Sequence, residues 1–251
     1  MNSEYVVPLE GEVDPAQAGV KNAQLDGIWV PKGFVVTAAA YQEFVRDAGL
    51  GPVIAQAVRR YRAGRDVVVA AAEVRSAFRD ASVPPAVTRE ILAAYDELGG
   101  EGTDVAVRCS PVSLPDGQQG EVFRHLRTGA DVVAACRRCF ASLFGSVAFG
   151  KREANGEDHL KAVMQVTVQR MIRADLGASG TVRGESTVLR ARATWGLGGS
   201  PADDAGQYSV HPGARPMIVK HRGAKATKTV YDDRRGRRSY PRPSASGPAW
   251  L

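Results

Sequence analysis

The chain has 251 residues, and 44% of them are hydrophobic, which is enough for one large domain or two modest ones with apolar cores. Its formal net charge is +6, and four arginines, Arg234, Arg235, Arg237 and Arg238, stand in one short run. A solvated tail is the favoured interpretation of this run, with a phosphate-binding arm as the alternative. Because no aromatic residues interleave with the arginines as a base-stacking surface requires, a nucleic-acid partner is not expected.

Composition also argues against a membrane or secreted protein. No apolar run approaches the roughly 20 residues of a membrane-spanning helix. The N-terminal sequence MNSEYVVPLEGEVDP has no basic region followed by an apolar stretch, so it predicts no secretion signal. The three cysteines are an odd number, which does not favour a disulfide framework and fits a reducing compartment. We therefore expect a cytoplasmic protein without a membrane partner.

The first half of the chain predicts a loop-rich start followed by a helical block. Gly and Pro divide residues 19–36 into short apolar pieces, typical of loops and one or two strands. Thr37 is a suitable N-cap for a helix that ends at Gly49. Apolar residues at helical spacing predict three further helices, over residues 51–63, over residues 67–80 and between Pro84 and Gly99.

The second half mixes strands with one helix. Residues 105–108 predict a strand, and Asp131 is a suitable cap for a helix over residues 132–144. In residues 162–172 apolar and polar side chains alternate, with Gln169 on the polar side. Such a strand, polar on one face and apolar on the other, is suited to form the wall of a cleft. Further strands are expected over residues 188–195 and within residues 215–231.

This order of elements predicts an α+β fold, or an α/β fold with two lobes. We expect a first lobe with the helical block over residues 1–175 and a partial second lobe over residues 176–233. Residues 234–251 are basic and poor in apolar side chains, and we expect a disordered tail there.

Three positions are candidate anion ligands. Lys21 can reach a phosphate as a point charge, although most lysines only solubilise a surface. Arg108 ends the strand 105–108 and carries a planar fork of donors suited to phosphate oxygens; a salt bridge to a nearby acid is an equally good explanation. Gly117 lets backbone N–H groups approach an anion, although a plain turn is the more common role.

The cysteine pair Cys136 and Cys139 has the spacing of a metal-binding pair. Both residues fall on the apolar stripe of the helix expected over residues 132–144, and no second pair exists. Core packing is therefore favoured over zinc. None of the four histidines falls in a Ser/His/Asp or Cys/His pattern, and we name no catalytic residue.

Several longer motifs resemble the N-terminal nucleotide-binding domain shared by phosphoenolpyruvate synthase, pyruvate phosphate dikinase and rifamycin phosphotransferase. GVKNAQL is similar to GGKNASL, VPKGFVVTAAAYQEFV to VPPGFxVTxxAYxxFL and VAVRCS to VAVRSS. CRRCFASLF is similar to CWASLF, VTVQRMIRADLGASG to VxVQRMVxSDxSG and ATWGLGG to AxWGLGE. The similarity runs in order from about Ala18 to Tyr231.

The resemblance implies an ATP-grasp-like fold in which two α+β lobes close on a nucleotide. It implies ATP and Mg²⁺ as ligands, and phosphoryl transfer to a histidine on another domain or chain. By their positions in the motifs, four residues are expected to bind ATP: Lys21, Arg108, Gly117 and Gln169. Transfer of this kind depends mainly on positioning and charge neutralisation, to which such residues are suited.

The sequence also departs from the family pattern. Between Arg108 and Glu121 it is shorter than the family loop and lacks a Glu-Asp pair, and Glu121 stands where the family has threonine. Gly199 stands where the family has an acid, and the stretch from Ser200 to Gln207 is shorter than in the family. We expect no counterpart in these 251 residues of the family's later Mg²⁺- and ATP-binding residues or of its histidine-bearing domain.

Three hypotheses follow. The chain is a reduced phosphotransferase component that works with a partner chain, or a catalytically inactive nucleotide-binding or structural relic, or a nucleic-acid-associated protein through its basic tail. The acceptor and the oligomeric state are left open.

Overall fold

The computed structural model describes nine stretches of the chain: residues 4–9, 31–111, 121–172, 178–185, 187–196, 205–213, 215–223, 227–232 and 236–241. These belong to two compact units, Met1–Met171 and Ile172–Leu251, which are described separately. The sequence analysis placed the boundary between the first and second lobes after residue 175. Mixed helices and antiparallel sheets confirm the predicted α+β class.

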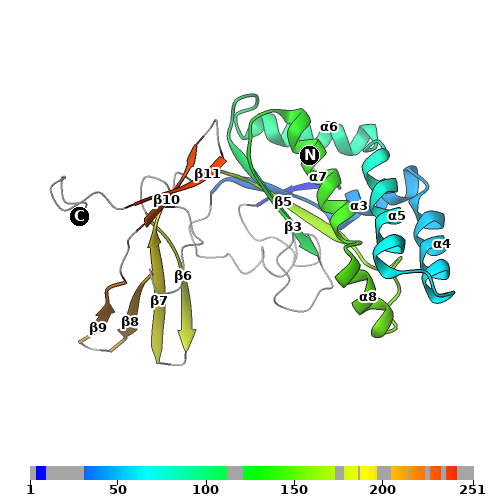
Figure 1. The fold of residues 1–251 in the computed structure, drawn as a ribbon. Helices are drawn as coiled ribbons and strands as arrows, with labels where there is room; N and C mark the ends of the chain where they lie inside the picture. The colour runs from blue at the N-terminus through cyan, green and yellow to red at the C-terminus, as the bar shows by residue number, and fades with distance from the viewer. Residues whose placement is uncertain are drawn as a thin grey trace. The chain divides into compact units, whose positions relative to one another are not determined.

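The first unit is built on a five-stranded antiparallel sheet in the order β1-β2-β5-β3-β4. Its strands are β1 (Val6–Pro8), β2 (Gly33–Val36), β3 (Val105–Pro111), β4 (Val122–Leu126) and β5 (Met164–Arg170). Strand β5 is central, since it pairs with β2 on one side and with β3 on the other. The helices lie against one face of this sheet (Figure 1).

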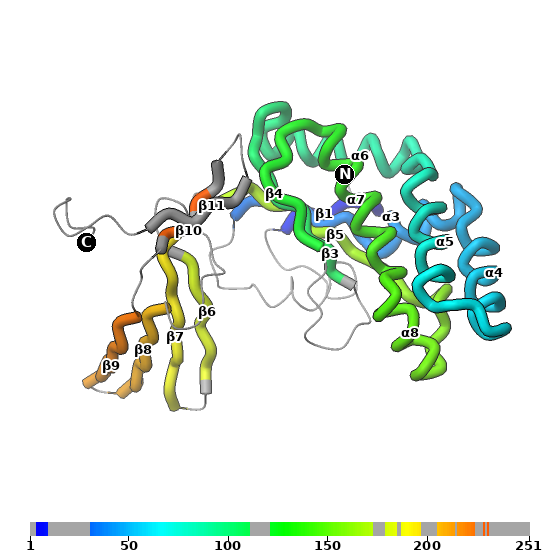
Figure 2. The backbone as a smooth tube through the Cα atoms, in the orientation of Figure 1, coloured from blue at the N-terminus to red at the C-terminus, as the bar shows by residue number. Residues whose placement is uncertain are grey.

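In the described part of the first unit, six helices lie between these strands: four between β2 and β3, and two between β4 and β5. They are α3 (Ala38–Asp47), α4 (Leu50–Arg62), α5 (Val67–Asp80), α6 (Pro85–Glu97), α7 (Gly129–Ser142) and α8 (Ser146–Ala154). Helices α3 and α7 contact β5 directly, and α5 packs outside them against α4, α7 and α8. The tube view in Figure 2 follows this layering along the backbone.

Capping residues set most of the helix ends that the sequence predicts. The Thr37 side chain accepts a hydrogen bond from the backbone N–H of Ala40 and caps α3, as expected. Pro85 opens α6 from its first turn. Gly49 adopts a left-handed conformation with φ of 60°, which lets the chain turn from α3 into α4.

The predicted cap of α7 is wrong by three residues. Thr128, not Asp131, is the N-cap: its side chain accepts a hydrogen bond from the Asp131 backbone N–H at 3.1 Å. Asp131 instead lies in the first turn, where its carboxylate accepts a hydrogen bond from the Thr128 hydroxyl at 2.7 Å. Both groups favour the helix N-terminus, which is why the sequence alone did not distinguish them.

Aromatic rings from three helices, α3, α5 and α7, form the centre of the first unit's core. The Tyr41 ring contacts the rings of Phe78 and Phe140, and Phe44 contacts the same two rings. All four side chains are buried, and valines from β3 and β5 close the cluster against the sheet. Burial of each large side chain contributes about 1.5–3 kcal/mol, so this cluster fixes the helices on the sheet.

The second unit consists of antiparallel strands. A four-stranded sheet has the order β6-β7-β8-β9, with β6 (Ala178–Glu185), β7 (Val188–Trp195), β8 (Gly206–His211) and β9 (Met217–His221). A separate hairpin pairs β10 (Thr227–Asp232) with β11 (Gly236–Pro241). The strands predicted over residues 188–195 and within residues 215–231 are confirmed, whereas β6 and β8 were missed.

The expectation of a disordered tail from residue 234 is wrong for Gly236–Pro241. These residues form β11, which pairs along its whole length with β10, and two arginines of the basic run, Arg237 and Arg238, lie opposite Tyr231 and Val230. Composition indicated disorder because few residues of the tail are apolar. Backbone pairing with β10 supplies hydrogen bonds that composition does not reveal.

One stretch of the described chain, Gly129–Ala154, has the length and mean hydropathy of a membrane-crossing helix. In the structure this stretch forms α7 and α8, and its apolar side chains include Phe140, Phe144 and Phe149 of the core. Its hydropathy is therefore explained by burial within the first unit.

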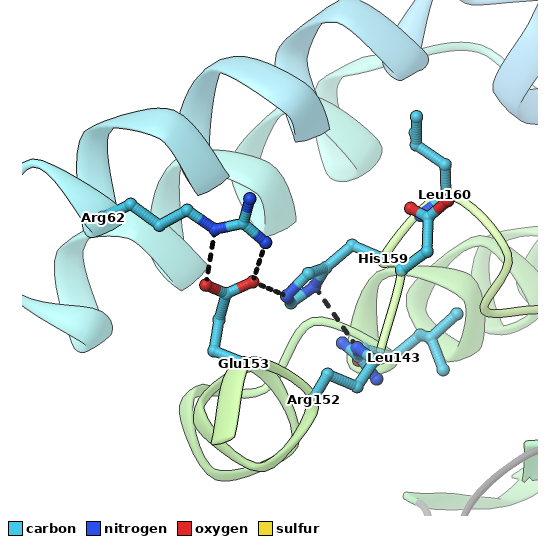
Figure 3. A network of polar contacts seen from close by, with 7 residues as sticks. Arg62, Leu143, Arg152, Glu153, His159 and Leu160 are labelled. Carbon is cyan, nitrogen blue, oxygen red and sulfur yellow. Dashed lines mark hydrogen bonds and ion pairs between the residues drawn. The ribbon is translucent and has the colours of Figure 1, made fainter. Parts of the chain in front are cut away.

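Helices α4 and α8 and the loop after α8 are joined by a network of charged side chains around His159 (Figure 3). Arg62 donates two hydrogen bonds to the Glu153 carboxylate, at 2.9 and 3.1 Å. The same carboxylate lies 3.0 Å from His159 Nε2, and Arg152 Nε donates to Nδ1 at 3.3 Å. These contacts fix the neutral imidazole, with its proton on Nε2 and directed at Glu153.

Burial and the charge of Arg152 lower the pKa of His159. The folded chain therefore keeps this ring neutral at pH values where an unfolded chain, with a histidine pKa of about 6.5, binds a proton. Since the unfolded state then binds more protons, we expect the free energy of unfolding to fall as the pH drops from about 7 toward 5. Hydrogen bonds and the charge of Arg62 likewise lower the pKa of Glu153, so a second loss follows below about pH 4.5.

Urea unfolding at a series of pH values tests this expectation. The variant His159→Gln removes the titrating ring, and it should flatten the pH dependence between 7 and 5 while leaving the loss at lower pH. An equally steep dependence in the variant would contradict the role assigned to His159.

Candidate functional site

The candidate site lies on the face of the first unit's sheet that points away from the helices. Side chains alternate along β3, and Val105 and Val107 are fully buried in the helix-packed core. Arg108, between Val107 and Cys109, therefore points to the opposite face. Antiparallel pairing places Arg108 beside Thr167 of β5 and Val122 of β4.

A second arginine shares this face. Arg124 follows Val122 by two residues on β4, so it lies on the same side of the sheet as Arg108. The atoms packed around Arg108 lower the pKa of its guanidinium, and the positive charge of Arg124 lowers it further. Arg108 nonetheless stays protonated, because arginine loses its proton only far above neutral pH.

Neither arginine is neutralised by an acid within the described residues. Arg108 is exposed, and no ion pair or side-chain hydrogen bond to a described residue is formed by Arg108 or Arg124. The salt bridge that the sequence left open for Arg108 is thus not formed in the described part of the chain. Two guanidinium groups on one face, without a partner acid, favour an external anion as their ligand.

A β-bulge positions Arg124 on that face. The register between β3 and β4 shifts between Val105 and Val107, and His125 has a φ of 60° at this point. The His125 ring is held by the Asp104 carboxylate at 2.9 Å. Because the bulge adds one residue, Phe123 and Leu126 both pack against the core while Arg124 lies on the other face.

Gln169 also lies on the face away from the helices, opposite Gly33 on β2 and Ala106 on β3. Its side chain crosses Gly33 closely: a Cβ atom added at Gly33 would lie 2.9 Å from Gln169 Cγ and 2.4 Å from the Val168 carbonyl oxygen. Only glycine leaves this space, so Gly33 determines where the Gln169 amide lies.

The polar face of β5, which the sequence suggested as the wall of a cleft, has little exposure to solvent. Gln165, Thr167 and Gln169 are 0%, 3% and 8% exposed. The polar face of β5 is thus covered almost as completely as the apolar one. A ligand therefore meets the exposed Arg108 first, and Gln169 can reach it only from a buried position.

The remaining predicted positions are distributed as follows. Lys21 and Gly117 lie outside the described residues, so they stay predictions. Cys136 and Cys139 are both fully buried in the helical core, which confirms core packing as their role. In the described chain no group of three or more His, Cys, Asp or Glu side chains gathers as a metal site.

Two residues of the site were missed in the sequence. Arg124 follows apolar Val122 and Phe123 in VFRHL, a segment without apolar–polar alternation, and no strand was predicted there. Its proximity to Arg108 still depends on the β3–β4 register. Gly33 stood in the quoted motif VPKGF, where its meaning depends on Gln169, 136 positions later in the chain.

Comparison with known proteins identifies the family of the chain. A family model described as the AMP/ATP-binding domain of pyruvate phosphate dikinase matches residues 16–247. The chain belongs to this family. The family resemblance read from the sequence motifs is thereby confirmed, together with the assignment of the chain as a nucleotide-binding domain.

Relatives of this domain carry a consistent name. A probable phosphoenolpyruvate synthase of Methanothermobacter thermautotrophicus is 36% identical over 92% of the chain, which covers 37% of that protein. Phosphoenolpyruvate synthases of Pseudomonas aeruginosa and Synechocystis sp. are 34% and 32% identical over 92% and 88% of the chain, covering 33% and 32% of their lengths. The dikinase-type domain described here thus spans about a third of the length of these relatives.

The close contact at Gly33 leads to a stability prediction. Gly33→Ala inserts a Cβ atom against the Val168 carbonyl and the Gln169 side chain, so β2 and β5 must separate. We expect a loss of about 2 kcal/mol in the free energy of unfolding, as for other overpacked sites, measured by urea titration.

Gly51→Ala is the matched control, because a Cβ atom at this position in α4 has no neighbour within 4 Å. This variant should be neutral or slightly stabilising. Equal stabilities of the two variants would show that the β2–β5 contact tolerates a side chain.

Proposed function

We propose that the chain binds ATP on the arginine-bearing face of its first unit and passes a phosphoryl group to a histidine on another domain or chain. The observation that carries this proposal is the pair of arginines, Arg108 and Arg124, on one sheet face without an acidic partner among the described residues. Membership in the AMP/ATP-binding family supplies the nucleotide. The names of the relatives support a phosphoenolpyruvate synthase-type reaction.

Each proposed ligand has a distinct task. The Arg108 guanidinium donates charge-assisted hydrogen bonds to phosphate oxygens, and Arg124 adds a second positive charge nearby. Lys21 supplies a point charge, and backbone N–H groups at Gly117 donate hydrogen bonds to a phosphate oxygen. The Gln169 side chain, which passes close to Gly33, orients the nucleotide from its buried position in the sheet.

An ATP-grasp-like closure of two lobes on the nucleotide belongs to the same proposal, with the second unit as part of the second lobe. Mg²⁺ would neutralise charge on the phosphates. The candidate protein ligand of Mg²⁺ is the carboxylate of the exposed residue Glu121. The backbone of Glu121 is fixed to β3, because its carbonyl oxygen accepts a hydrogen bond from the Cys109 N–H at 3.2 Å. Without a metal this carboxylate would repel the phosphates, so ATP should bind as its magnesium complex. We place the reaction in the cytoplasm.

A catalytically inactive relic is the competing proposal. The shortened segment between Arg108 and Glu121, and a glutamate in place of the family threonine, favour it. The two proposals differ in whether Mg-ATP binds at all, and this can be measured directly.

Isothermal titration calorimetry with Mg-ATP tests the binding site. We expect binding by the wild-type chain, weakened about 10- to 100-fold in Arg108→Ala and in Lys21→Ala, since each removes a charged contact to phosphate. Arg79→Ala is the matched control: Arg79 is an exposed arginine in the last turn of α5, and its removal should leave the affinity unchanged. A folded wild-type chain that binds no Mg-ATP would favour the relic.

The phosphoryl acceptor leads to a separate prediction. We expect the 251-residue chain by itself to form no phosphoenolpyruvate from ATP and pyruvate, because the proposal places the phosphoryl-accepting histidine on another domain or chain. A coupled assay with a full-length phosphoenolpyruvate synthase as positive control measures this. Turnover by the pure chain would contradict the requirement for a second domain or chain.

A further inference from the structure

Two of the three cysteines meet across the interface between sheet and helix. Cys109 points from β3 into the helix-packed core, on the strand face opposite that of Arg108. Cys139 lies on α7 and is fully buried. Their Sγ atoms are 2.7 Å apart, and both cysteines are free thiols.

We propose that Cys109 and Cys139 are a redox-active pair that closes to a reversible disulfide and ties strand β3 to helix α7. The separation of the two sulfur atoms exceeds a disulfide bond by only about 0.6 Å, so side-chain rotation or a small backbone shift closes it. The proposal does not depend on nucleotide binding.

The surroundings of the pair distinguish an attacking thiol from a resolving one. The hydrogen bond from Cys139 lowers the pKa of Cys109, and the Ser142 hydroxyl, 3.5 Å from Cys109 Sγ, lowers it further, against the opposing effect of burial. Burial raises the pKa of Cys139 well above the ordinary thiol value. Cys109 is also the less buried of the two, at 8% exposure, so it meets an oxidant first.

Cys136 is the internal comparison. It lies on the same helix as Cys139 and is fully buried, and burial strongly raises its pKa. No hydrogen bond joins its sulfur to another described side chain. The geometry thus selects one pairing, Cys109 with Cys139, out of the three that are possible.

The oxidant is a small disulfide or a hydroperoxide. With a small disulfide, the Cys109 thiolate attacks one sulfur and displaces a thiolate, and Cys139, after losing its proton, attacks the mixed disulfide and displaces the second thiolate. With hydrogen peroxide, Cys109 becomes a sulfenic acid as the O–O bond breaks and one water forms; Cys139 then attacks its sulfur and a second water leaves. In both routes two thiols lose two electrons and two protons, and the oxidant gains them.

The first test is the cross-link itself. The folded chain is treated with oxidised glutathione or hydrogen peroxide, the remaining thiols are alkylated, and the digest is analysed by mass spectrometry without reduction. We expect a Cys109–Cys139 linked peptide, with Cys136 alkylated, and its disappearance after dithiothreitol. Glutathione retained on Cys109, overoxidation of Cys109 without the link, or no reaction would each overturn the proposal.

Stability gives a second readout. A link between residues 30 positions apart restricts the unfolded chain, so oxidation should raise the melting temperature of the wild type by about 5 °C or more. Cys136→Ser should show the same rise, whereas Cys109→Ser should show none. If Cys109→Ser failed to fold, the peptide map and the Cys136→Ser comparison would still show whether the Cys109–Cys139 disulfide forms. A link that involves Cys136 would overturn the assignment.

Discussion

Antiparallel pairing of β3 with β5 is the constraint on which the rest of the first unit depends. Each residue of these strands is assigned to one of two faces, and the faces have different chemistry. Val107 and Val168 pair on the side that buries the aromatic cluster, while Arg108 and Thr167 pair on the other side. A slip of one residue would carry Arg108 into the helical core, where an uncompensated guanidinium costs several kcal/mol, and would expose the valines. The register that stabilises the core therefore also fixes Arg108 on the opposite face, where we propose that it binds phosphate.

Local sequence signals were sufficient for much of this fold. Helices α4, α5 and α6 were predicted because their apolar spacing and their glycine or proline boundaries act over a few residues. The alternation of β5 was equally plain. Strands β6, β8 and β11 were missed because few of their residues are apolar, so their existence rests on backbone pairing with neighbours that the sequence does not identify. Burial of Gln169 was likewise inaccessible, since it depends on what covers this face of the sheet and not on the residues beside Gln169 in the sequence.

The candidate site shows the same division between local and distant information. Arg108 was found from its motif, but its relation to Arg124 requires the β3–β4 register and the bulge at His125. Other arginines of the first unit show what a structural role looks like. Arg62 is paired with Glu153 through two hydrogen bonds, and Arg152 is buried and donates to the Leu143 carbonyl. Arg108 and Arg124 have no such contacts among the described residues. Burial lowers the pKa of Arg108, and repulsion by the charge of Arg124 lowers it further. Like charges held together without compensation do not stabilise a fold, and this is the physical reason for assigning them to a ligand.

Strand β3 thus carries two reactive groups on adjacent residues, one on each face. Family members have serine in the motif VAVRSS where this chain has Cys109, and serine has nearly the same size but cannot form a disulfide. A cysteine at this position therefore adds the proposed redox chemistry on the face of β3 opposite Arg108. Because Arg108 and Cys109 share a peptide unit, any restraint that a disulfide places on β3 acts directly on the backbone that holds Arg108. A strand exposed on one side and anchored by a covalent bond on the other has less freedom to adjust to a bound phosphate. Oxidation and anion binding would then be linked through this single strand, without any movement elsewhere in the sheet.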